Sequence, residues 1–373
     1  MNTQITIFLD ERWGIVQDIV FINGNNRKFA AKTVEGGLSR NRAWEKWLLS
    51  HSAGVKDLQL KKGKIIHNFQ VYCALLLNRN KTIFFLYPVV GVPIFYMNFF
   101  EKILSRVFFL CVKISNRYNT VVFDISDLKY EQSIDLNLLN TREGIRGKEI
   151  EEKLFSTNSF YIFASNSMKK YACDKYNIDP NKADVCINGG SEIKADCIRN
   201  NEYLDMIDEK CINFVYAGTL NKGRQIEELI SSFPNNTRIH LYLLGPNGEW
   251  INTERENISY LGPIEEDIAH AFVSRCDVGI IPYDENRPYY NIAYPTKLSF
   301  YITANLPFLS TPVSEVEVEN EKINGGWLLP MKKWPEFFEN IDIEDIKMKK
   351  DKIKEISGQY LWETIIRKNI FIK

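Results

Sequence analysis

The amino-acid sequence predicts an α/β protein made of two domains, each a parallel sheet wrapped by helices. Short apolar runs alternate with helix-period segments along the chain, as in repeated βα units. The 373 residues are too many for one ordinary domain and suit two. Asn188–Gly190 interrupts the pattern, which restarts after a polar run that ends at Lys210. We therefore place the domains at 1–190 and 191–356, and expect a terminal helix over about 357–373 to pack back on the first domain.

In the first domain, β-branched and aromatic runs of strand length alternate with longer segments of helical period. The expected strands are Ile5–Leu9, Ile19–Ile22, Lys64–His67, Ile83–Tyr87, Thr120–Ile125, Tyr161–Ala164 and Val185–Ile187. The expected helices are Asn41–Leu49, Phe99–Ile114, Ile145–Leu154 and Ser167–Tyr176. Strands separated by helices imply crossover connections and therefore parallel pairing.

The second domain repeats this alternation. Its expected strands are Ile212–Tyr216, Arg238–Leu244, Ile258–Leu261, Val278–Ile281 and Pro307–Ser310. Its expected helices are Gln225–Phe233, Glu265–Arg275 and Thr296–Thr303, and a charged helix-period segment runs from about Ile343 to Ile370. Leu361 and Ile365 share one face of that last segment, which we expect to be buried.

Charge and cysteine content exclude several function classes. The net charge is zero, which argues against nucleic acid as a partner. Residues 1–190 nevertheless carry 26 Lys and Arg against 18 Asp and Glu, and residues 191–373 carry 21 against 29. The basic and acidic halves indicate different partners. The seven scattered cysteines form no CxxC pair, so we expect free thiols in a cytoplasmic protein and no zinc site.

One uncharged segment, Thr82–Phe100, has the length of a membrane span. Pro88, Gly91 and Pro93 lie at its centre and disfavour a helix. We expect a buried strand that ends in a Pro/Gly loop, with the aromatic residues of Ile94–Phe100 at a membrane surface. Because the first half is basic, that surface would be the anionic inner face of the membrane.

The first segment whose residues could form a binding site is 213–230, where an apolar strand ends at Gly218. Glycine at a strand end lets a ligand approach the backbone closely. Lys222 and Arg224 follow in the loop, and a helix begins directly afterwards. Two cations and helix amides together form an anion site of the kind that a diphosphate requires. The alternative is a solvated βα turn in which the glycine only allows the backbone to turn tightly.

A second segment, 276–312, contains a strand, an irregular loop and a helix that begins at Tyr294-Pro295-Thr296-Lys297. Proline is tolerated at a helix start, where its missing N–H costs nothing. Thr296 and the first-turn amides can donate to phosphate oxygens, and Lys297 adds charge. A lysine in the first turn opposes the helix dipole and is well placed there only beside an anion. The alternative is a Lys297 that is simply solvated.

These segments resemble the donor half of GT-B glycosyltransferases, closest to a bacterial subgroup of galactofuranosyltransferases and adhesin accessory glucosyltransferases. The matching residues are Gly218-Thr219-Leu220 with Lys222 and Arg224, Asp277-Val278-Gly279, and Pro295-Thr296-Lys297-Leu298-Ser299-Phe300-Tyr301 up to Pro307. The resemblance implies two Rossmann-like domains that face each other across a cleft. It also implies that the second domain binds a UDP-sugar, with Tyr260–Ile264 near the base and Tyr294 in the nucleotide-sugar site.

The sequence departs from many retaining GT-B enzymes at one point. Those enzymes carry two glutamates, the second of which binds the ribose hydroxyls, and here Ile292 and Phe300 occupy these places. Neither side chain can accept a hydrogen bond. The stereochemical outcome of that larger family is therefore not carried over.

The candidate catalytic residues lie in the first domain. Asp124 and Asp127 lie at the end of the strand Thr120–Ile125, at the edge where open parallel sheets bind ligands. His67, at the end of another expected strand, is the third candidate for a base that deprotonates an acceptor hydroxyl. Each residue has a structural alternative, as a cap, a loop or a core side chain. An Asp-x-Asp pair is absent, so we expect no metal and no other cofactor.

Two further clusters allow both a functional and a structural interpretation. The tyrosines Tyr283, Tyr289, Tyr290 and Tyr294 could stack on a sugar or base, or could simply pack the loop. The acidic run Glu315, Glu317, Glu319 and Glu321 is interpreted as solvated surface.

Together these features predict a hexosyltransferase that moves a sugar from a UDP-sugar to a saccharide acceptor in bacterial surface polysaccharide or glycan assembly. A lipid-linked acceptor at the inner membrane face suits the basic first half, and a homo-oligomer is left open. Two alternatives remain: a nucleotide-sugar epimerase of the same fold, and a non-catalytic glycan-binding partner subunit. Donor sugar, acceptor and linkage are not fixed by the sequence.

Overall fold

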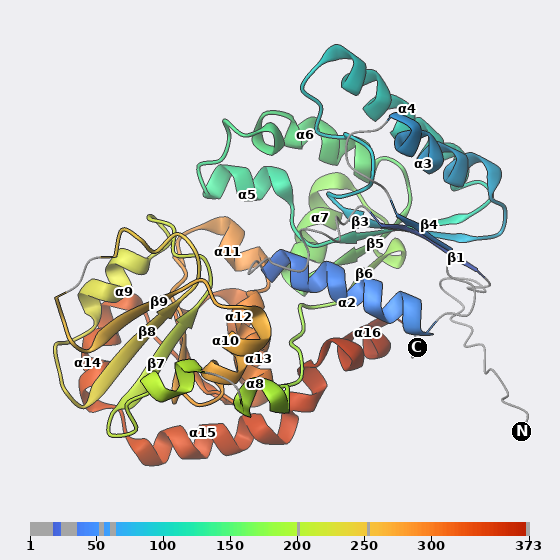
Figure 1. The fold of residues 1–373 in the computed structure, drawn as a ribbon. Helices are drawn as coiled ribbons and strands as arrows, with labels where there is room; N and C mark the ends of the chain where they lie inside the picture. Colours follow the sequence, from blue (N-terminus) through green and yellow to red (C-terminus); the bar gives the residue numbers. More distant parts are fainter. Residues whose placement is uncertain are drawn as a thin grey trace, which may run out of the picture. The chain divides into compact units, whose positions relative to one another are not determined.

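The protein was analysed as a computed structural model, which describes residues 18–23, 36–51, 56–59, 65–199, 202–251 and 254–370. The chain forms two compact units (Figure 1). Of the described residues, unit 1 contains those of 18–23, 40–187 and 366–370, and unit 2 contains those of 36–39 and 188–365.

The unit 1 sheet has six parallel strands in the order β2-β1-β3-β4-β5-β6. The strands are β1 (Ile19–Asn23), β2 (Lys56–Gln59), β3 (Thr82–Tyr87), β4 (Thr120–Ile125), β5 (Phe160–Phe163) and β6 (Ala183–Val185). Four of the seven expected strands are confirmed, and the one at Ile5–Leu9 lies outside the described residues. The strand expected at Val185–Ile187 lies two residues earlier, as β6. The strand predicted at Lys64–His67 is wrong, because a helix begins at Ile65 and includes His67.

Helices cover both faces of this sheet (Figure 1). They are α2 (Gly36–His51), α3 (Ile65–Leu77), α4 (Phe99–Ser115), α5 (Lys129–Asp135), α6 (Arg142–Phe155) and α7 (Asn166–Tyr176). Successive residues of a strand point to opposite faces. Accordingly Phe84 of β3 contacts Trp44 of α2, whereas Phe85 contacts Phe108 of α4.

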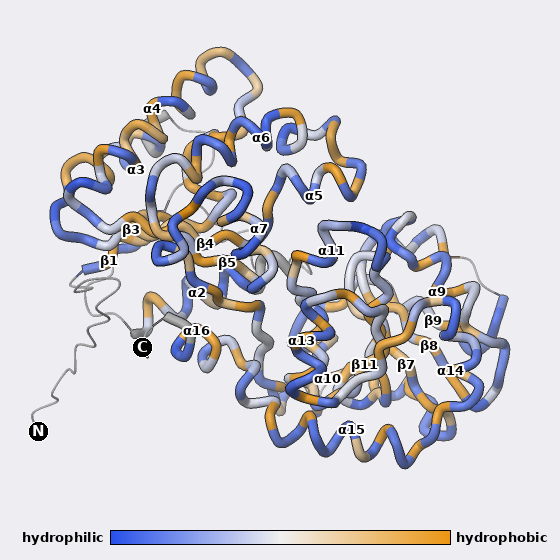
Figure 2. Tube along the Cα trace, turned by 180° about the vertical axis from the view of Figure 1, so that it is seen from behind, coloured by the Kyte–Doolittle hydropathy of each residue, from blue (hydrophilic) through white to orange (hydrophobic). Residues whose placement is uncertain are grey.

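The unit 2 sheet is also six-stranded and parallel, in the order β12-β11-β10-β7-β8-β9. Its strands are β7 (Ile212–Ala217), β8 (Ile239–Leu244), β9 (Ile258–Gly262), β10 (Val278–Ile281), β11 (Phe308–Ser310) and β12 (Gly326–Leu328). Counted within the unit, this is the strand order 3-2-1-4-5-6 of the Rossmann fold. The strand order reverses between β7 and β10. The apolar strands at the centre of each unit stand out from their hydrophilic surroundings (Figure 2).

The helices of unit 2 again lie on two faces. They are α8 (Ala195–Arg199), α9 (Ile226–Ser232), α10 (Glu266–Val273), α11 (Pro288–Ile292), α12 (Thr296–Thr303), α13 (Ser314–Ile323), α14 (Trp334–Asn340) and α15 (Ile343–Ile356). The last helix, α16 (Trp362–Ile370), begins in unit 2 and ends in unit 1. Leu241 and Leu243 of β8 join the core with Phe338 of α14. Tyr242, between them, contacts Phe272 of α10 on the other face.

The acidic run is only in part the solvated surface that the sequence predicts, because Glu317 and Glu321 are exposed but the other two glutamates are buried. It lies on α13, where Glu315 and Glu319 are 1% and 3% exposed. Glu319 accepts a hydrogen bond from the Tyr360 hydroxyl and pairs with Lys322 at 2.7 Å. Glu315 and Glu319 are four residues apart and therefore lie on one helix face, which here is the buried one.

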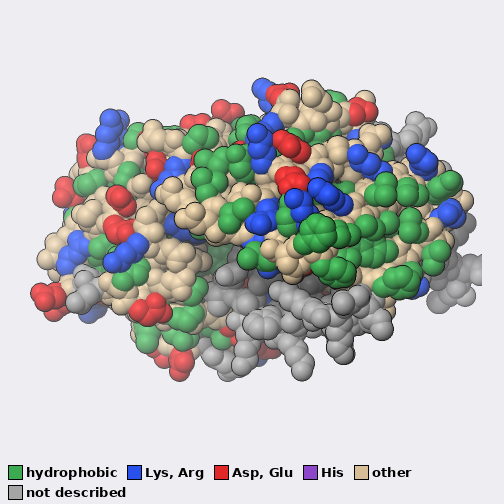
Figure 3. Space-filling model, turned by 90° about the horizontal axis from the view of Figure 1, so that it is seen from above, with side chains coloured by type: hydrophobic (Ala, Val, Ile, Leu, Met, Phe, Trp, Pro, Cys, Tyr) green, Lys and Arg blue, Asp and Glu red, His purple; other side chains and the backbone are tan. Residues whose placement is uncertain are grey.

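The uncharged segment after Lys81 divides as expected into a fully buried strand, β3, and a loop up to the start of α4. Within the described residues, no helix combines the length and apolarity needed to cross a membrane. Unit 1 does expose large apolar side chains over α3 and α4, with lysines and arginines beside them (Figure 3).

Candidate functional site

The carboxyl ends of β7 and β10 frame the candidate site. The two strands pair only at Phe214–Val278 and Val215–Gly279 and then separate. The Tyr301 hydroxyl of α12 lies between them. It accepts from the Ala217 N–H at 3.1 Å and contacts the carbonyl of Ile280 at 3.1 Å. Ligands of doubly wound sheets bind at such a point, where the strand order reverses.

Gly218, directly after β7, has a backbone that only glycine adopts readily, with φ of +151°. A Cβ at this position would lie 2.7 Å from Cε and 2.9 Å from Nζ of Lys297. The lysine side chain of α12 therefore rests directly on the Gly218 backbone. The loop after β8 also lies close to Gly218, because a Cβ on Gly245 would lie 2.0 Å from the Gly218 carbonyl oxygen.

Lys297 has an unusual environment for a cation. Its Nζ lies 4.9 Å from the ring centroid of Tyr216 and 5.4 Å from that of Tyr283. Solvent still reaches part of the side chain, although protein atoms surround the ammonium group closely. Burial, and secondly the charge of Arg224, lower the pKa of Lys297 to about 7. Within the described part of the chain, Lys297 and Arg224 have no ion-pair partner.

Of the two cations predicted in the loop after β7, Arg224 is the one whose charge lowers the pKa of Lys297. The electrostatic effect of Arg224 reaches both Lys297 and Tyr216. Lys222 is exposed and lies over the Trp250 ring, 5.4 Å from its centroid. Within this loop, the Gly223 N–H donates to the Glu227 carboxylate of α9 at 3.0 Å. Arg224 and Lys297 are therefore the candidate anion-binding side chains at the end of β7.

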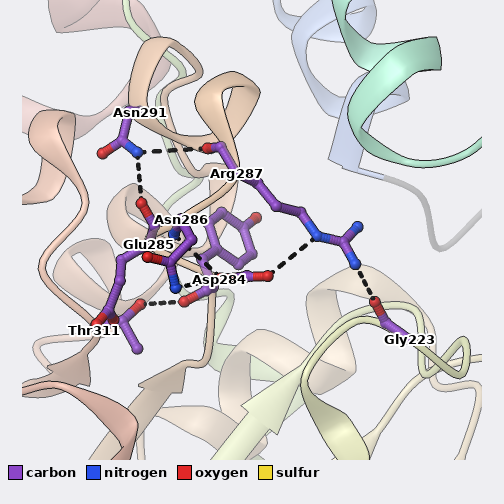
Figure 4. Close-up of polar contacts among 8 residues, drawn as sticks. Gly223, Asp284, Glu285, Asn286, Arg287, Asn291 and Thr311 are labelled. Atoms are coloured by element: carbon purple, nitrogen blue, oxygen red, sulfur yellow. Dashed lines mark hydrogen bonds and ion pairs between the residues drawn. The ribbon is translucent and has the colours of Figure 1, made fainter.

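An arginine that the sequence analysis did not single out connects the two loops. Arg287 donates to the Gly223 carbonyl at 3.2 Å and to the Asp284 carboxylate at 3.3 Å (Figure 4). Figure 4 shows the side chain extended from one loop to the other. Thr311 holds the segment after β10, which carries Arg287, by donating to the Tyr283 carbonyl at 2.6 Å. These contacts fix the position of the loop that carries Arg224.

The start of α12 places Thr296 and Lys297 as predicted, after Pro295. Thr296 is partly exposed, and the first-turn amides of a helix have no intrahelical acceptors. Tyr294 is only 3% exposed, and its hydroxyl lies 2.8 Å from the Ser299 hydroxyl. Its ring therefore offers little surface for stacking. Tyr283 and Tyr290 stack on each other, with centroids 4.5 Å apart.

Tyr260 of β9 holds the loop after β8 in place. Its hydroxyl donates to the Gly245 carbonyl at 3.1 Å and accepts the Gly248 N–H at 3.3 Å. A Cβ on Gly248 would lie 2.5 Å from the Tyr260 ring. The polar end of Tyr260 is thus engaged within the protein, while its side chain remains partly exposed.

In unit 1, the three candidate bases have different environments. Asp124 is 1% exposed and forms a bidentate ion pair with Arg40, at 2.8 Å and 2.5 Å. Arg40 also donates to the Cys186 carbonyl at 2.7 Å. A carboxylate enclosed in this way cannot reach an acceptor, so we withdraw Asp124 as a base. His67 lies in α3 rather than at a strand end, and its side chain is outside the described set.

Asp127 is the accessible member of this group. It lies just after β4, is 28% exposed, and has the Lys129 ammonium 3.7 Å from its carboxylate. Gln132 donates to the same carboxylate at 3.4 Å. The described residues contain no group of three His, Cys, Asp or Glu side chains that could hold a metal ion.

No protein-family model matches the sequence, and no curated protein is significantly similar to it. Several solved structures match its fold. WaaG, a glycosyltransferase involved in lipopolysaccharide biosynthesis, is 11% identical and superposes with a TM-score of 0.57 over 83% of this chain and 95% of WaaG. Anabaena HepE in complex with UDP-glucose is 13% identical, with a TM-score of 0.61 over 94% of this chain and 97% of HepE.

A sucrose-phosphate synthase from Thermosynechococcus elongatus is also 13% identical, with a TM-score of 0.65 over 94% of this chain and 97% of the synthase. These matches extend over both units, and each unit has a parallel six-stranded sheet. The chain therefore has the GT-B fold, with two Rossmann-like domains.

Proposed function

We propose that this chain is a glycosyltransferase that transfers a hexosyl group from a UDP-sugar to a saccharide acceptor. One observation carries the proposal: Lys297 lies against Gly218 at the end of β7, the charge of Arg224 lowers its pKa, and neither cation has an ion-pair partner among the described residues. Two neighbouring cations repel each other, so their placement is costly unless an anion lies between them. A diphosphate supplies that anion.

The chemistry of glycosyl transfer explains why these groups suit the role. The departing diphosphate gains negative charge as the bond to the sugar breaks, and fixed positive groups stabilise that charge. The side chains of Lys297 and Arg224 supply the positive charge, and Thr296 and the first-turn amides of α12 add hydrogen bonds. We propose that these groups make the transfer metal-independent. Gly218, without a Cβ, lets the Lys297 side chain lie against the backbone at the end of β7.

The finer assignment combines motifs with structural likeness. The Pro295–Tyr301 motif supports the galactofuranosyltransferase and adhesin glucosyltransferase subgroup, and hence UDP-glucose, UDP-galactose or UDP-galactofuranose as donor. A lipopolysaccharide glycosyltransferase and a UDP-glucose complex among the structural matches agree with a role in bacterial surface polysaccharide or glycan assembly. If the reaction inverts, Asp127 is the candidate in unit 1 to take the acceptor proton.

The nucleotide site is tested by calorimetry with UDP on two variants of the same loop. Arg224→Gln should weaken UDP binding about 30-fold, because a charge-assisted hydrogen bond contributes about 2 kcal/mol. Lys222→Gln, which removes the exposed cation over Trp250, is the matched control and should change affinity less than about threefold. Equal losses in both variants would contradict the assignment of the anion to Arg224.

Turnover separates the proposal from its alternatives. The protein is incubated with each UDP-sugar, with and without a panel of saccharide acceptors, and products are separated by chromatography. Acceptor-dependent release of UDP with a glycosylated product supports a transferase. Interconversion of epimers without an acceptor would indicate an epimerase. No UDP binding at millimolar concentration would indicate a non-catalytic subunit.

A further inference from the structure

Helix α4 of unit 1 is apolar on its outer face as well as on its inner face. Phe108 and Val112 are fully buried toward the sheet. The outer face also carries apolar side chains, from 40% to 78% exposed: Phe99, Phe100, Ile103, Val107 and Leu110. A helix at a protein surface normally presents polar residues to solvent. A second apolar face of this size indicates an interaction surface.

The neighbouring helix α3 extends this surface. The Tyr72 hydroxyl of α3 donates to the Leu104 carbonyl of α4 at 2.9 Å, so the two helices are in direct contact. Phe69 and Leu77 of α3 are 64% and 75% exposed. Hydrophobic side chains gather over these helices in Figure 3. We call this set the α3–α4 surface: Phe69, Leu77, Met97, Phe99, Phe100, Ile103, Val107 and Leu110.

Basic side chains accompany the apolar ones. The segment from Phe99 to the turn after α4 contains one acidic residue, Glu101, and four basic residues, which are Lys102, Arg106, Lys113 and Arg117. Glu101 is engaged locally, because its carboxylate accepts the Met97 N–H at 2.6 Å. None of the four basic residues forms an ion pair with any residue that the structure describes. Arg106, Lys113 and Arg117 are exposed, so their charge is available to an anionic partner. Lys102 is partly buried and lies over the Tyr96 ring, 5.5 Å from its centroid.

We propose that the α3–α4 surface docks on an anionic lipid bilayer. Apolar side chains would enter the boundary between headgroups and acyl chains, and the flanking cations would meet lipid phosphates. A second copy of the chain fits less well, because a two-fold contact would bring the unpaired cations of two α4 helices together. The docking is peripheral and does not depend on the proposed enzymatic activity.

The test is co-sedimentation of the full chain with phosphatidylcholine vesicles, with and without phosphatidylglycerol. We expect binding only to the anionic vesicles. Raising the salt from about 0.1 M to about 1 M shortens the Debye length from about 10 Å to about 3 Å and should weaken binding at least tenfold. UDP affinity, measured separately, reports on the nucleotide site whatever the vesicles show.

Two variants separate the apolar and the charged parts of the surface. Arg106→Gln/Lys113→Gln should weaken binding to anionic vesicles about 20-fold, because each basic residue near an anionic leaflet contributes about a fivefold factor. Phe99→Ser/Leu110→Ser should weaken it at least tenfold. Both pairs are exposed, so circular dichroism and the thermal midpoint should match the wild type. The matched control, Lys210→Gln/Lys354→Gln, removes two exposed charges from unit 2 and should bind like the wild type.

Three outcomes would overturn the proposal. The wild type could fail to sediment with anionic vesicles, or the control pair could lose as much binding as the α4 pair. Alternatively, light scattering could show a dimer that Phe99→Ser/Leu110→Ser dissociates. That last result would assign the surface to a second copy of the chain.

Discussion

Each unit contains an ionisable side chain whose pKa lies near 7, but the two side chains have opposite surroundings. In unit 1, burial raises the pKa of Glu151 to about 7. Its carboxylate accepts the Tyr130 N–H at 3.0 Å and the Tyr176 hydroxyl at 2.8 Å, and the side chain is fully buried. In unit 2, burial lowers the pKa of Lys297 to about 7, but this side chain faces aromatic rings, backbone and another cation.

The difference separates a structural group from a binding group. Glu151 has its hydrogen-bond partners within unit 1 and has no solvent access. Lys297 has partial solvent access and no anion among its described neighbours. A shifted pKa alone therefore does not identify a site, because desolvation acts on both residues. What distinguishes Lys297 is a charge without a partner at the end of a parallel strand.

The largest effect is expected from Glu151. Glu151→Ala leaves the Tyr130 N–H and the Tyr176 hydroxyl without an acceptor and opens a cavity, at a cost of about 3–5 kcal/mol in the free energy of unfolding. Glu151→Gln retains an acceptor and should cost about 1 kcal/mol at pH 5. Urea unfolding measures both values. A loss under about 1 kcal/mol in Glu151→Ala would show that the enclosure contributes little.

Glu151→Gln also tests the pH dependence. The folded pKa of Glu151 lies above its unfolded value, so its contribution is present below about pH 4.5 and is lost as pH rises through about 7. The difference between the folded and unfolded pKa values of Glu151 corresponds to roughly 3 kcal/mol in the free energy of unfolding. The free energy of unfolding of Glu151→Gln should therefore fall less between pH 5 and pH 8 than that of the wild type. Parallel curves would contradict the raised pKa.

A change at Lys297 should instead act on binding. Lys297→Met removes a charge-assisted contact to phosphate and should weaken UDP binding about 100-fold, equivalent to about 3 kcal/mol. The fold should be retained, because the variant removes a desolvated cation and keeps the apolar stem. Calorimetry and thermal unfolding measure the two effects, with Lys354→Met as an exposed-lysine control. A large fall in the thermal midpoint would instead assign Lys297 to the core.

The pH dependence of UDP affinity gives a smaller effect of defined sign. Bound phosphate would raise the pKa of Lys297 from about 7, so binding takes up a proton and weakens as pH rises. Affinity should fall about tenfold between pH 7 and pH 8.5, a range above the second phosphate pKa of about 6. Lys297→Arg stays charged and should abolish this dependence. A flat wild-type profile would contradict the lowered pKa.

Much of the fold could be predicted because its signals are local. The strands Thr120–Ile125 and Val278–Ile281 and the helix Thr296–Thr303 have the predicted bounds. By contrast, β2 (Lys56–Gln59) is short and polar and, among the described strands, pairs only with β1, so its sequence lacks the apolar signal of a central strand. The segment that begins α3 is apolar, and such short runs do not distinguish strand from helix.

The site was less predictable, because its partners are far apart in the chain. Gly218 and the start of α12 could be anticipated, since the ends of parallel strands meet at one sheet edge. The enclosure of Asp124 could not, because Arg40 is 84 residues away and no local pattern links them. The burial of Glu315 and Glu319 likewise depends on which face of α13 packs inward.

The smallest effect is expected at Arg287, whose role in the site is indirect. Arg287→Ala removes the contacts to Gly223 and Asp284 that position the loop of Arg224, and should weaken UDP binding about threefold to fivefold, equivalent to about 1 kcal/mol. Arg238→Ala is the matched control, because Arg238 also donates to a distant backbone carbonyl, that of Glu339. The double variant Arg224→Gln/Arg287→Ala should be no weaker than Arg224→Gln alone, since Arg287 acts through Arg224. Additive losses in the double variant would instead place Arg287 in direct contact with the nucleotide.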